Sequence, residues 1–274
     1  MLYICGTPIG NLEDISPRLI NTLKEVDFIL CEDTRHSIKL LNHLNISKKL
    51  ISYNKDNELK KADDLITLLL ENKKIALISD AGMPIISDPG YFLVKKAIEN
   101  NINIIPISGP TAFTLALVAS GFEIDTFIFY GFIDRDKNKR EKFFEDIKQQ
   151  NKVIVFYESP HKLLNTLKEL LEKIADLEIC LARELTKKYE EFWRGNVSEA
   201  INYFSEKEIK GEFCIVLNAY KKEEESGETQ DINDFISNIL SKDIPTKDAS
   251  KIIAEKFNIS SKEAYKMIIN FKNI

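Results

Sequence analysis

The stretch 75–90, IALISDAGMPIISDPG, places a short apolar run directly before two acidic turns. The run Ile75–Ile78 has the length of a buried strand. Each of the turns that follow, Ser79–Pro84 and Ser87–Gly90, contains Asp, Gly and Pro. Ligands of open parallel α/β sheets bind beyond the carboxyl ends of the strands, and glycine lets a ligand approach the backbone closely. We therefore expect a ligand-binding loop here, with an ordinary long turn as the alternative.

Three further apolar runs precede loops of small or polar residues. The expected strand–loop pairs are Leu2–Cys5 with Gly6–Asn11, Phe28–Cys31 with Glu32–His36, and Ile102–Ile107 with Ser108–Ala112. Helical patterns alternate with these strands, which indicates a parallel sheet with helices on both faces. Because the carboxyl ends of parallel strands share one edge, we expect all four loops to gather there around a ligand.

The sequence argues against dinucleotide, P-loop and metal sites, and against a membrane or secreted protein. The chain contains neither GxGxxG nor GxxxxGK[ST], the motifs of dinucleotide and P-loop sites. His36 has no second ligand at a recognisable spacing, so no metal site is expected. The cysteines lie far apart, which is typical of buried thiols in a reducing compartment. They are Cys5, Cys31, Cys180 and Cys214. No stretch is long and apolar enough to span a membrane and no signal peptide is evident, so we expect a cytoplasmic protein.

The length of 274 residues allows for two domains of ordinary size. A composition shift after Gly121 divides the chain, and the polar stretch Lys221–Thr229 reads as a linker. We expect an N-terminal α/β domain over 1–120, a second α/β domain over 121–220 and a small helical extension over 230–274. Strands of the second domain are predicted at Phe127–Phe132, Val153–Tyr157 and Glu178–Ala182, with a helix over Leu163–Ile174. A turn plus strand over Lys210–Leu217 closes this domain.

Two charged segments, Asp134–Lys142 and Arg183–Gly195, each have two possible interpretations. The net charge of −5 argues against a uniformly basic nucleic-acid binder but permits a local basic patch. The stretch Asp134–Lys142, DRDKNKREK, is either a solvated helix face or a phosphate contact. Segment Arg183–Gly195 mixes cations with aromatic residues and holds the single tryptophan. That mixture suits RNA and equally suits a domain or dimer interface.

The tail is predicted to be helical over Phe235–Leu240, Ala249–Phe257 and Ala264–Phe271. A turn over Asn258–Ser260 leads into Ser260–Glu263, which has the sequence of a capping box. Helix, short turn and helix resemble a helix-turn-helix, although any small helical bundle gives this pattern. The tail is therefore either an RNA-contacting appendage or a packing element.

Six motifs together resemble one known family. They are TPIGNLEDISPR, CEDTRHS, SDAGMPIISDPG, ISGPTAFTLAL, FYESPHK and ARELTKKYEEFWRG. They resemble the bacterial ribosomal small-subunit RNA cytidine 2′-O-methyltransferases, within the tetrapyrrole-methylase-like superfamily of S-adenosylmethionine enzymes. The resemblance runs to about Leu217, and the tail is similar to that family's C-terminal extension.

This resemblance implies two α/β domains of the tetrapyrrole-methylase type with the S-adenosylmethionine cofactor between them, in a homodimer. It also implies that the substrate is the 2′-hydroxyl of a cytidine in the decoding region of 16S ribosomal RNA, within the small ribosomal subunit. The cofactor site that it implies consists of Pro8, Asp80, Gly82, Met83, Ser108, Thr111, Ala112, Tyr157 and Ala182.

A ribose hydroxyl reacts poorly until its proton is removed, and a positioned base contributes on the order of 10²–10⁴-fold. Acids at the expected strand ends are Asp33, Glu158 and Glu184. We favour Glu184 as this base, with a structural ion pair to Arg183 or Lys187 as the alternative. Arg35 joins Glu184 and Asp33 as a catalytic candidate, because positive charge near the hydroxyl lowers its pKa. The predicted RNA contacts are Arg18, Arg183, Lys187 and Arg194.

Two other classes of function stay open. One is a small-molecule methyltransferase acting on a tetrapyrrole, which an enclosed apolar second domain would favour. The other is a non-enzymatic RNA-binding or regulatory protein that uses the tail as a reader. The four strand-end loops argue against a pure reader, because such a protein has no need of them.

Overall fold

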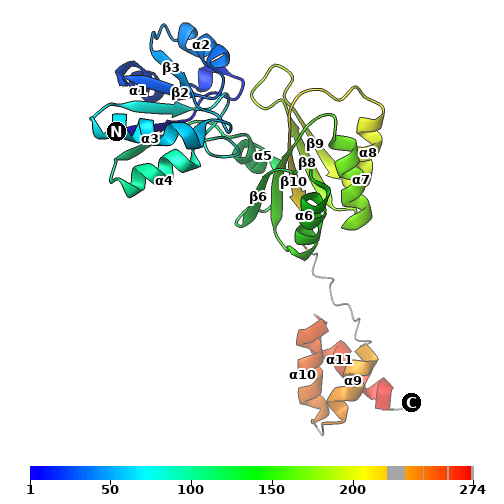
Figure 1. Ribbon diagram of the computed structural model, residues 1–274. Helices are drawn as coiled ribbons and strands as arrows, with labels where there is room; N and C mark the ends of the chain where they lie inside the picture. Colours follow the sequence, from blue (N-terminus) through cyan, green and yellow to red (C-terminus); the bar gives the residue numbers. More distant parts are fainter. Residues whose placement is uncertain (221–231, 243, 258, 273–274) are drawn as a thin grey trace. The chain divides into compact units, whose positions relative to one another are not determined.

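The computed structural model describes residues 1–220, 232–242, 244–257 and 259–272 (Figure 1). The chain divides into two compact units, Met1–Tyr220 and Lys221–Ile274. The first unit contains two five-stranded sheets. The expected linker over Lys221–Thr229 lies outside the described residues.

The first sheet is parallel throughout, as the alternation of strands and helices predicts. Its strands are β1 (Leu2–Cys5), β2 (Phe28–Cys31), β3 (Lys49–Ser52), β4 (Ile75–Ile78) and β5 (Ile104–Ile107). They are ordered β3-β2-β4-β1-β5. The loops after β1, β2, β4 and β5 therefore leave the same edge of the sheet, as expected.

Helices cover both faces of this sheet. They are α1 (Pro17–Glu25), α2 (Thr34–His43), α3 (Glu58–Leu70) and α4 (Tyr91–Glu99), with the short 3₁₀ helix η1 (Leu12–Asp14) before α1. Ser16 caps α1 by accepting a hydrogen bond from Leu19 N (3.1 Å). Leu30 of β2 packs with α3 and α4, whereas its neighbour Ile29 packs with α1 and α2. The alternating direction of side chains along a strand produces these two cores.

The second sheet is mixed. Its strands are β6 (Phe127–Phe132), β7 (Val153–Glu158), β8 (Glu178–Arg183), β9 (Glu191–Asn196) and β10 (Phe213–Asn218). They are ordered β6-β7-β10-β8-β9. Only the β6–β7 pair is parallel among these neighbours. The core on one face is shared with α6 (Lys137–Gln149), α7 (Leu163–Lys173) and α8 (Val197–Ser205).

The helix α5 (Ala112–Ser120) covers the other face of the second sheet. Ala116 and Leu117 pack there with Val155 of β7 and Cys180 of β8. This helix falls inside the stretch 1–120 that is predicted to form the first domain, yet its apolar side chains pack on the second sheet. The two sheets are thereby joined through the loop that precedes α5.

The segment Arg183–Gly195, predicted as an RNA contact or an interface, contains all of β9 except its last residue and is followed by α8. The Trp193 ring lies 5.8 Å from Tyr203 and 6.3 Å from Phe204 between ring centroids. The tryptophan therefore packs against α8 of the same unit. Neither element was predicted; β9 combines acidic, basic and glycine residues and lacks clear alternation.

Two glycines allow the loops after β1 and β5 to touch through their backbones. A Cβ placed on Gly109 would lie 2.7 Å from backbone atoms of Gly6. We expect Gly109→Ala to lower the free energy of unfolding by about 1–3 kcal/mol, because the backbone must shift to relieve the overlap. Urea unfolding measures this change, with Ser108→Ala in the same loop as the control. Equal stability of the two variants would contradict the prediction.

The second unit forms a small core of its own. Its helices are α9 (Ile232–Leu240), α10 (Thr246–Phe257) and α11 (Ser261–Lys272). Their buried side chains include Ile236, Ile253 and Ile268, which pack together. The predicted capping box is confirmed: Ser260 Oγ accepts from Glu263 N (3.2 Å) and Glu263 Oε2 accepts from Ser260 N (3.1 Å). Asn258 of the predicted turn lies outside the described residues.

The four cysteines are buried and unpaired, as predicted. Burial raises the pKa of the Cys5 thiol to about 12. Across the part of the chain that the structure describes, no helix has both the length and the apolarity needed to cross a membrane.

Candidate functional site

A cavity of about 360 Å³ lies where the loops of the first sheet meet the ends of β7, β8 and β10. Its size falls within the range of small-molecule sites. The first sheet contributes residues 80–83 and 86–88 from the loop after β4, and Thr111 and Ala112 open α5 at its edge. The second sheet contributes residues 157–160, Ala182 and residues 212–214. The loop 79–90, which the sequence predicts to bind a ligand, therefore forms one wall of this cavity.

Most of the residues predicted to hold the cofactor lie together here. Those lining the cavity are Asp80, Gly82, Met83, Thr111, Ala112, Tyr157 and Ala182. The other two line neighbouring hollows: Pro8 faces a groove beside α2, and Ser108 faces a hollow beside Phe192. Burial raises the pKa of Tyr157, so its hydroxyl stays protonated at neutral pH.

Backbone contacts hold the wall formed by the loop after β4. Thr7 N donates to Gly82 O (2.9 Å) and Gly82 N donates to Thr7 O (3.1 Å). Thr7 Oγ1 also donates to Ser79 O (3.1 Å). Farther along the same loop, Ile85 and Ser87 have φ values of 77° and 73°. Such left-handed conformations in residues other than glycine are strained and gather at functional sites.

An acidic group lies beside this wall. Burial raises the pKa of Asp88 to about 6, and the charges of Glu32 and Asp80 add to the effect. Burial and the charge of Asp80 also raise the pKa of Glu32. Lys55 opposes these charges in part and donates to Ser87 O (3.4 Å). Asp88 was absent from the predicted site residues, although the motif Ser87-Asp88-Pro89-Gly90 at a strand end signalled it.

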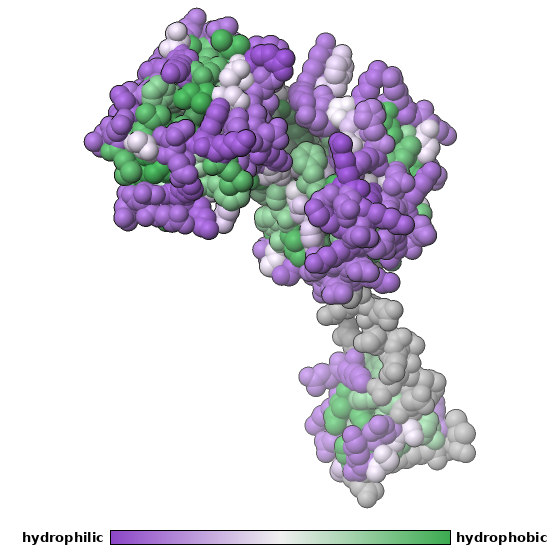
Figure 2. All heavy atoms as spheres, in the orientation of Figure 1, coloured by the Kyte–Doolittle hydropathy of each residue, from purple (hydrophilic) through white to green (hydrophobic). Residues whose placement is uncertain are grey.

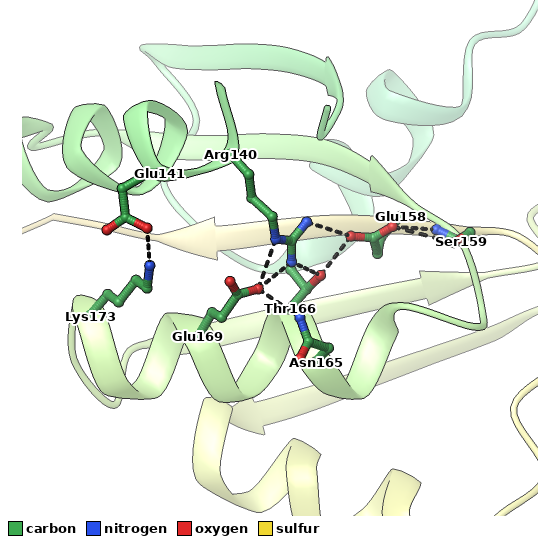
Figure 3. Close-up of polar contacts among 8 residues, drawn as sticks. All are labelled: Arg140, Glu141, Glu158, Ser159, Asn165, Thr166, Glu169 and Lys173. Atoms are coloured by element: carbon green, nitrogen blue, oxygen red, sulfur yellow. Dashed lines mark hydrogen bonds and ion pairs between the residues drawn. The ribbon is translucent and has the colours of Figure 1, made fainter. Parts of the chain in front are cut away.

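A buried network supports the cavity wall that follows β7 (Figure 3). Glu158 Oε2 accepts from Thr166 Oγ1 (2.6 Å) and lies 3.7 Å from Arg140 Nη1. Arg140 also donates from Nε to Glu169 Oε2 (2.8 Å) and from Nη2 to Thr166 Oγ1 (2.7 Å). Glu158 Oε1 accepts from Ser159 N (2.8 Å). The candidate base Glu158 is thus 4% exposed and engaged on both oxygens.

The network also removes one cation of the stretch Asp134–Lys142 from the protein surface. Figure 2 shows hydrophilic residues over the outer surface of α6, in agreement with a solvated face. Arg140 is the exception, because its side chain is only 13% exposed. It is therefore engaged inside the protein and unavailable to a phosphate.

Asp33 and Arg35 lie outside the cavity, at the start of α2. Asp33 caps the helix by accepting from Arg35 N (2.8 Å), and its other oxygen lies 2.9 Å from Arg35 Nη2. Hydrogen bonds from the Arg35 side chain and backbone lower the pKa of Asp33. The Arg35 side chain is 90% exposed. These two catalytic candidates thus form a surface ion pair.

Glu184 also lies outside the cavity lining. Its Oε1 accepts from Lys187 Nζ (2.9 Å) and from Glu212 N (3.0 Å). Partial burial favours a higher pKa for Glu184, but the hydrogen bonds from Lys187 and from the Glu212 backbone outweigh it and lower the pKa. Its φ is 51°. This geometry favours the ion-pair alternative, in which the carboxylate joins β8 to the turn before β10.

We expect Glu184→Gln to reduce stability by about 1–3 kcal/mol, since Lys187 and Glu212 N lose a charged acceptor. The loss of turnover should stay well below the roughly 10²–10⁴-fold supplied by a general base. Thermal unfolding and single-turnover methyl transfer measure the two effects. A stable variant with turnover reduced a thousandfold would restore Glu184 as the base.

Three of the four predicted RNA contacts are engaged within the protein. Arg183 donates to Lys210 O (2.7 Å) and lies 3.2 Å from Glu191. Lys187 pairs with Glu212 as well as Glu184. Arg194 donates to the carbonyl oxygens that end α5, at Ala119 and Ser120. Arg18 is exposed on α1.

The histidines of α2 do not gather with other ligands. His36 and His43 are both exposed on this helix. Over residues 1–220 and the described parts of the tail, no three His, Cys, Asp or Glu side chains are arranged to hold a metal ion.

Comparisons with known proteins agree with this architecture. Residues 1–201 match the family described as Tetrapyrrole (Corrin/Porphyrin) Methylases. Among solved structures, the methyltransferase CobJ has a TM-score of 0.59 at 17% identity, covering 79% of this chain and 93% of that one. The uroporphyrin-III-C-methyltransferase of Thermus thermophilus has a TM-score of 0.56 at 18% identity, covering 80% and 94%. These two structures support the fold alone.

Relatives at higher identity carry a more specific name. A Thermotoga maritima protein named ribosomal RNA small subunit methyltransferase I is 51% identical over 79% of this chain and 97% of its own length. A Bacillus subtilis protein of the same name is 42% identical over 97% of this chain and 92% of its own length. The chain therefore belongs to the tetrapyrrole methylase family, and within it to the group named ribosomal RNA small subunit methyltransferase I.

Proposed function

We propose that this chain transfers a methyl group from S-adenosylmethionine to the 2′-hydroxyl of a cytidine in the decoding region of 16S ribosomal RNA. The observation that carries the proposal is 39–51% identity to relatives named ribosomal RNA small subunit methyltransferase I. The choice of a cytidine 2′-oxygen rests on the motifs that resemble the 2′-O-methyltransferases. A ribosomal substrate agrees with the expected cytoplasmic location.

The cavity has the chemistry that S-adenosylmethionine requires. When bound, the cofactor supplies a methyl group on a positively charged sulfur. Asp80 and Asp88 give the cavity negative charge, and Glu32 adds to it from outside the lining. Apolar side chains, among them Ile9, Met83 and Leu185, line the same space. The acidic groups, the apolar lining and the volume of the cavity all suit the cofactor, so we assign the cofactor to this cavity.

The chain's own residues would position the reaction more than perform it, because methyl transfer depends mainly on placement. The Thr7–Gly82 bridge fixes one wall and the Glu158 network fixes the opposite one. Side chains of Ile9, Leu185 and Phe213 would limit the access of water. We keep the seven predicted residues that line the cavity as proposed cofactor contacts.

The proposal also covers the partners implied by the resemblance. Exposed lysines on α10 and α11, including Lys251, Lys262 and Lys266, would contact RNA phosphates. A homodimer would cover apolar side chains that are exposed in the single chain, such as Val118 and Phe132.

Transfer of labelled methyl from S-adenosylmethionine tests the activity. The acceptors are bulk RNA, small ribosomal subunits that lack the modification, and a tetrapyrrole precursor. We expect label on one cytidine 2′-oxygen, preferentially in the subunit. Label on the tetrapyrrole alone would contradict the proposal and favour a small-molecule methyltransferase. Cofactor binding without transfer to any acceptor would favour a non-enzymatic role.

A further inference from the structure

A groove of about 270 Å³ runs between α2 and the loop that follows β1. The loop side consists of Thr7, Pro8, Gly10 and Leu12. The helix side includes His36, Lys39 and His43. Because these three residues are three and four positions apart, they lie along one face of the helix. We call this feature the α2 groove.

The α2 groove adjoins the proposed cofactor cavity. Thr7 lines the groove and Gly82 lines the cavity, and the backbones of these two residues are hydrogen-bonded to each other. Asp80 lines both spaces. A group held in the α2 groove would therefore lie one layer of backbone away from the cavity wall.

The helix side chains that line the α2 groove are accessible to an anion. His36, Lys39 and His43 are exposed, and neither His36 nor Lys39 forms an ion pair within the described part of the chain. Lys187 and Arg183, by contrast, are held by internal carboxylates. Asp80 is the carboxylate that also lines the groove, and it accepts from Asp33 N (3.3 Å).

We propose that the α2 groove binds a backbone phosphate of the RNA strand, next to the nucleotide that is methylated at the neighbouring cavity. The ammonium of Lys39 supplies the charge, and the imidazole N–H groups of His36 and His43 supply hydrogen bonds to phosphate oxygens. Contacts of this kind position a strand without selecting its sequence. This inference rests on the proposed function, in which RNA is methylated at the neighbouring cavity.

The salt dependence of RNA binding tests this assignment. We expect Lys39→Gln to reduce the slope of log affinity against log salt concentration by about one, since one phosphate contact is lost. The KM for the small ribosomal subunit should rise, whereas kcat and the Kd for S-adenosylmethionine stay unchanged. Lys95→Gln on α4, at another exposed lysine, is the matched control. The variant His36→Asn, His43→Asn should raise KM in the same way.

The experiments distinguish a failure of this inference from a failure of the proposed function. If the wild-type protein methylates RNA and Lys39→Gln behaves like Lys95→Gln in KM and in salt slope, the α2 groove does not bind the strand. If the wild-type protein methylates no RNA, the proposed function fails, and direct binding of a 16S RNA fragment by fluorescence anisotropy decides the groove. In that assay a reduced slope for Lys39→Gln supports the phosphate site, and an unchanged slope overturns it.

Discussion

Replacing Arg140 with methionine is expected to lower the free energy of unfolding by about 3–5 kcal/mol, the cost of leaving a buried charge without its partner. Arg140 lies between Glu158 and Glu169 and donates to Thr166 (Figure 3). Glu158 is almost completely buried, so water cannot replace the lost guanidinium. Methionine keeps the length of the side chain and its packing on Phe144, which isolates the effect of charge.

Urea unfolding measures this loss, and Arg135→Met is the control because Arg135 is exposed in the same charged stretch. Arg140→Lys should recover little of the stability, since one ammonium cannot reproduce the planar set of donors. Both Arg140 variants should also weaken S-adenosylmethionine binding, because Glu158 holds Ser159 N at the cavity wall. If Arg140→Met were no less stable than Arg135→Met, the network would have no structural role.

The features predicted correctly from the sequence are those that depend on residues close together in the chain. Short apolar strands, each followed by a loop of small residues, were sufficient to predict the parallel sheet and the common edge of its loops. The loop 79–90 could be singled out because its glycines, prolines and acids follow a buried strand directly. That reasoning predicted a ligand beside the loop, whereas the family resemblance named Asp80, Gly82 and Met83, which line the cavity.

The orientation of single charged residues was harder to predict. The stretch Asp134–Lys142 looks uniformly solvated, yet Arg140 points inward. The buried residues Phe143, Phe144 and Ile147 lie three, four and seven positions after it on α6, so helical periodicity could have identified it. Its acidic partners Glu158 and Glu169 come from other elements, and local pattern does not show which elements meet.

Long-range packing limited the site prediction in the same way. Arg183, Lys187 and Glu184 look available in a segment rich in charge, but Lys210 and Glu212, in the turn before β10, supply partners for them. The helix α5 follows the first sheet in the chain and packs on the second. Both facts depend on contacts between residues distant in sequence.

The affinity for S-adenosylmethionine is expected to fall about tenfold between pH 7 and pH 5. The pKa of Asp88 in the free protein is about 6, and a bound cation beside the carboxylate lowers that pKa. Binding therefore releases a proton at pH values below about 6, and each further pH unit costs about tenfold in affinity when the ligand selects the ionised form. Above pH 7 Asp88 is already ionised, so the affinity should reach a plateau.

Asp88→Asn tests this linkage, because asparagine mimics the protonated acid at every pH. The variant should bind S-adenosylmethionine at least about tenfold more weakly than the wild type at pH 7 and show no change of affinity near pH 6. S-Adenosylhomocysteine lacks the positive charge on sulfur and keeps the rest of the molecule, so its binding should depend less on pH in the wild type. Isothermal titration calorimetry between pH 5 and 8 measures all four curves. An unchanged pH dependence in Asp88→Asn would assign the titration to another group, and equal behaviour of the two ligands would show that the sulfonium does not face Asp88.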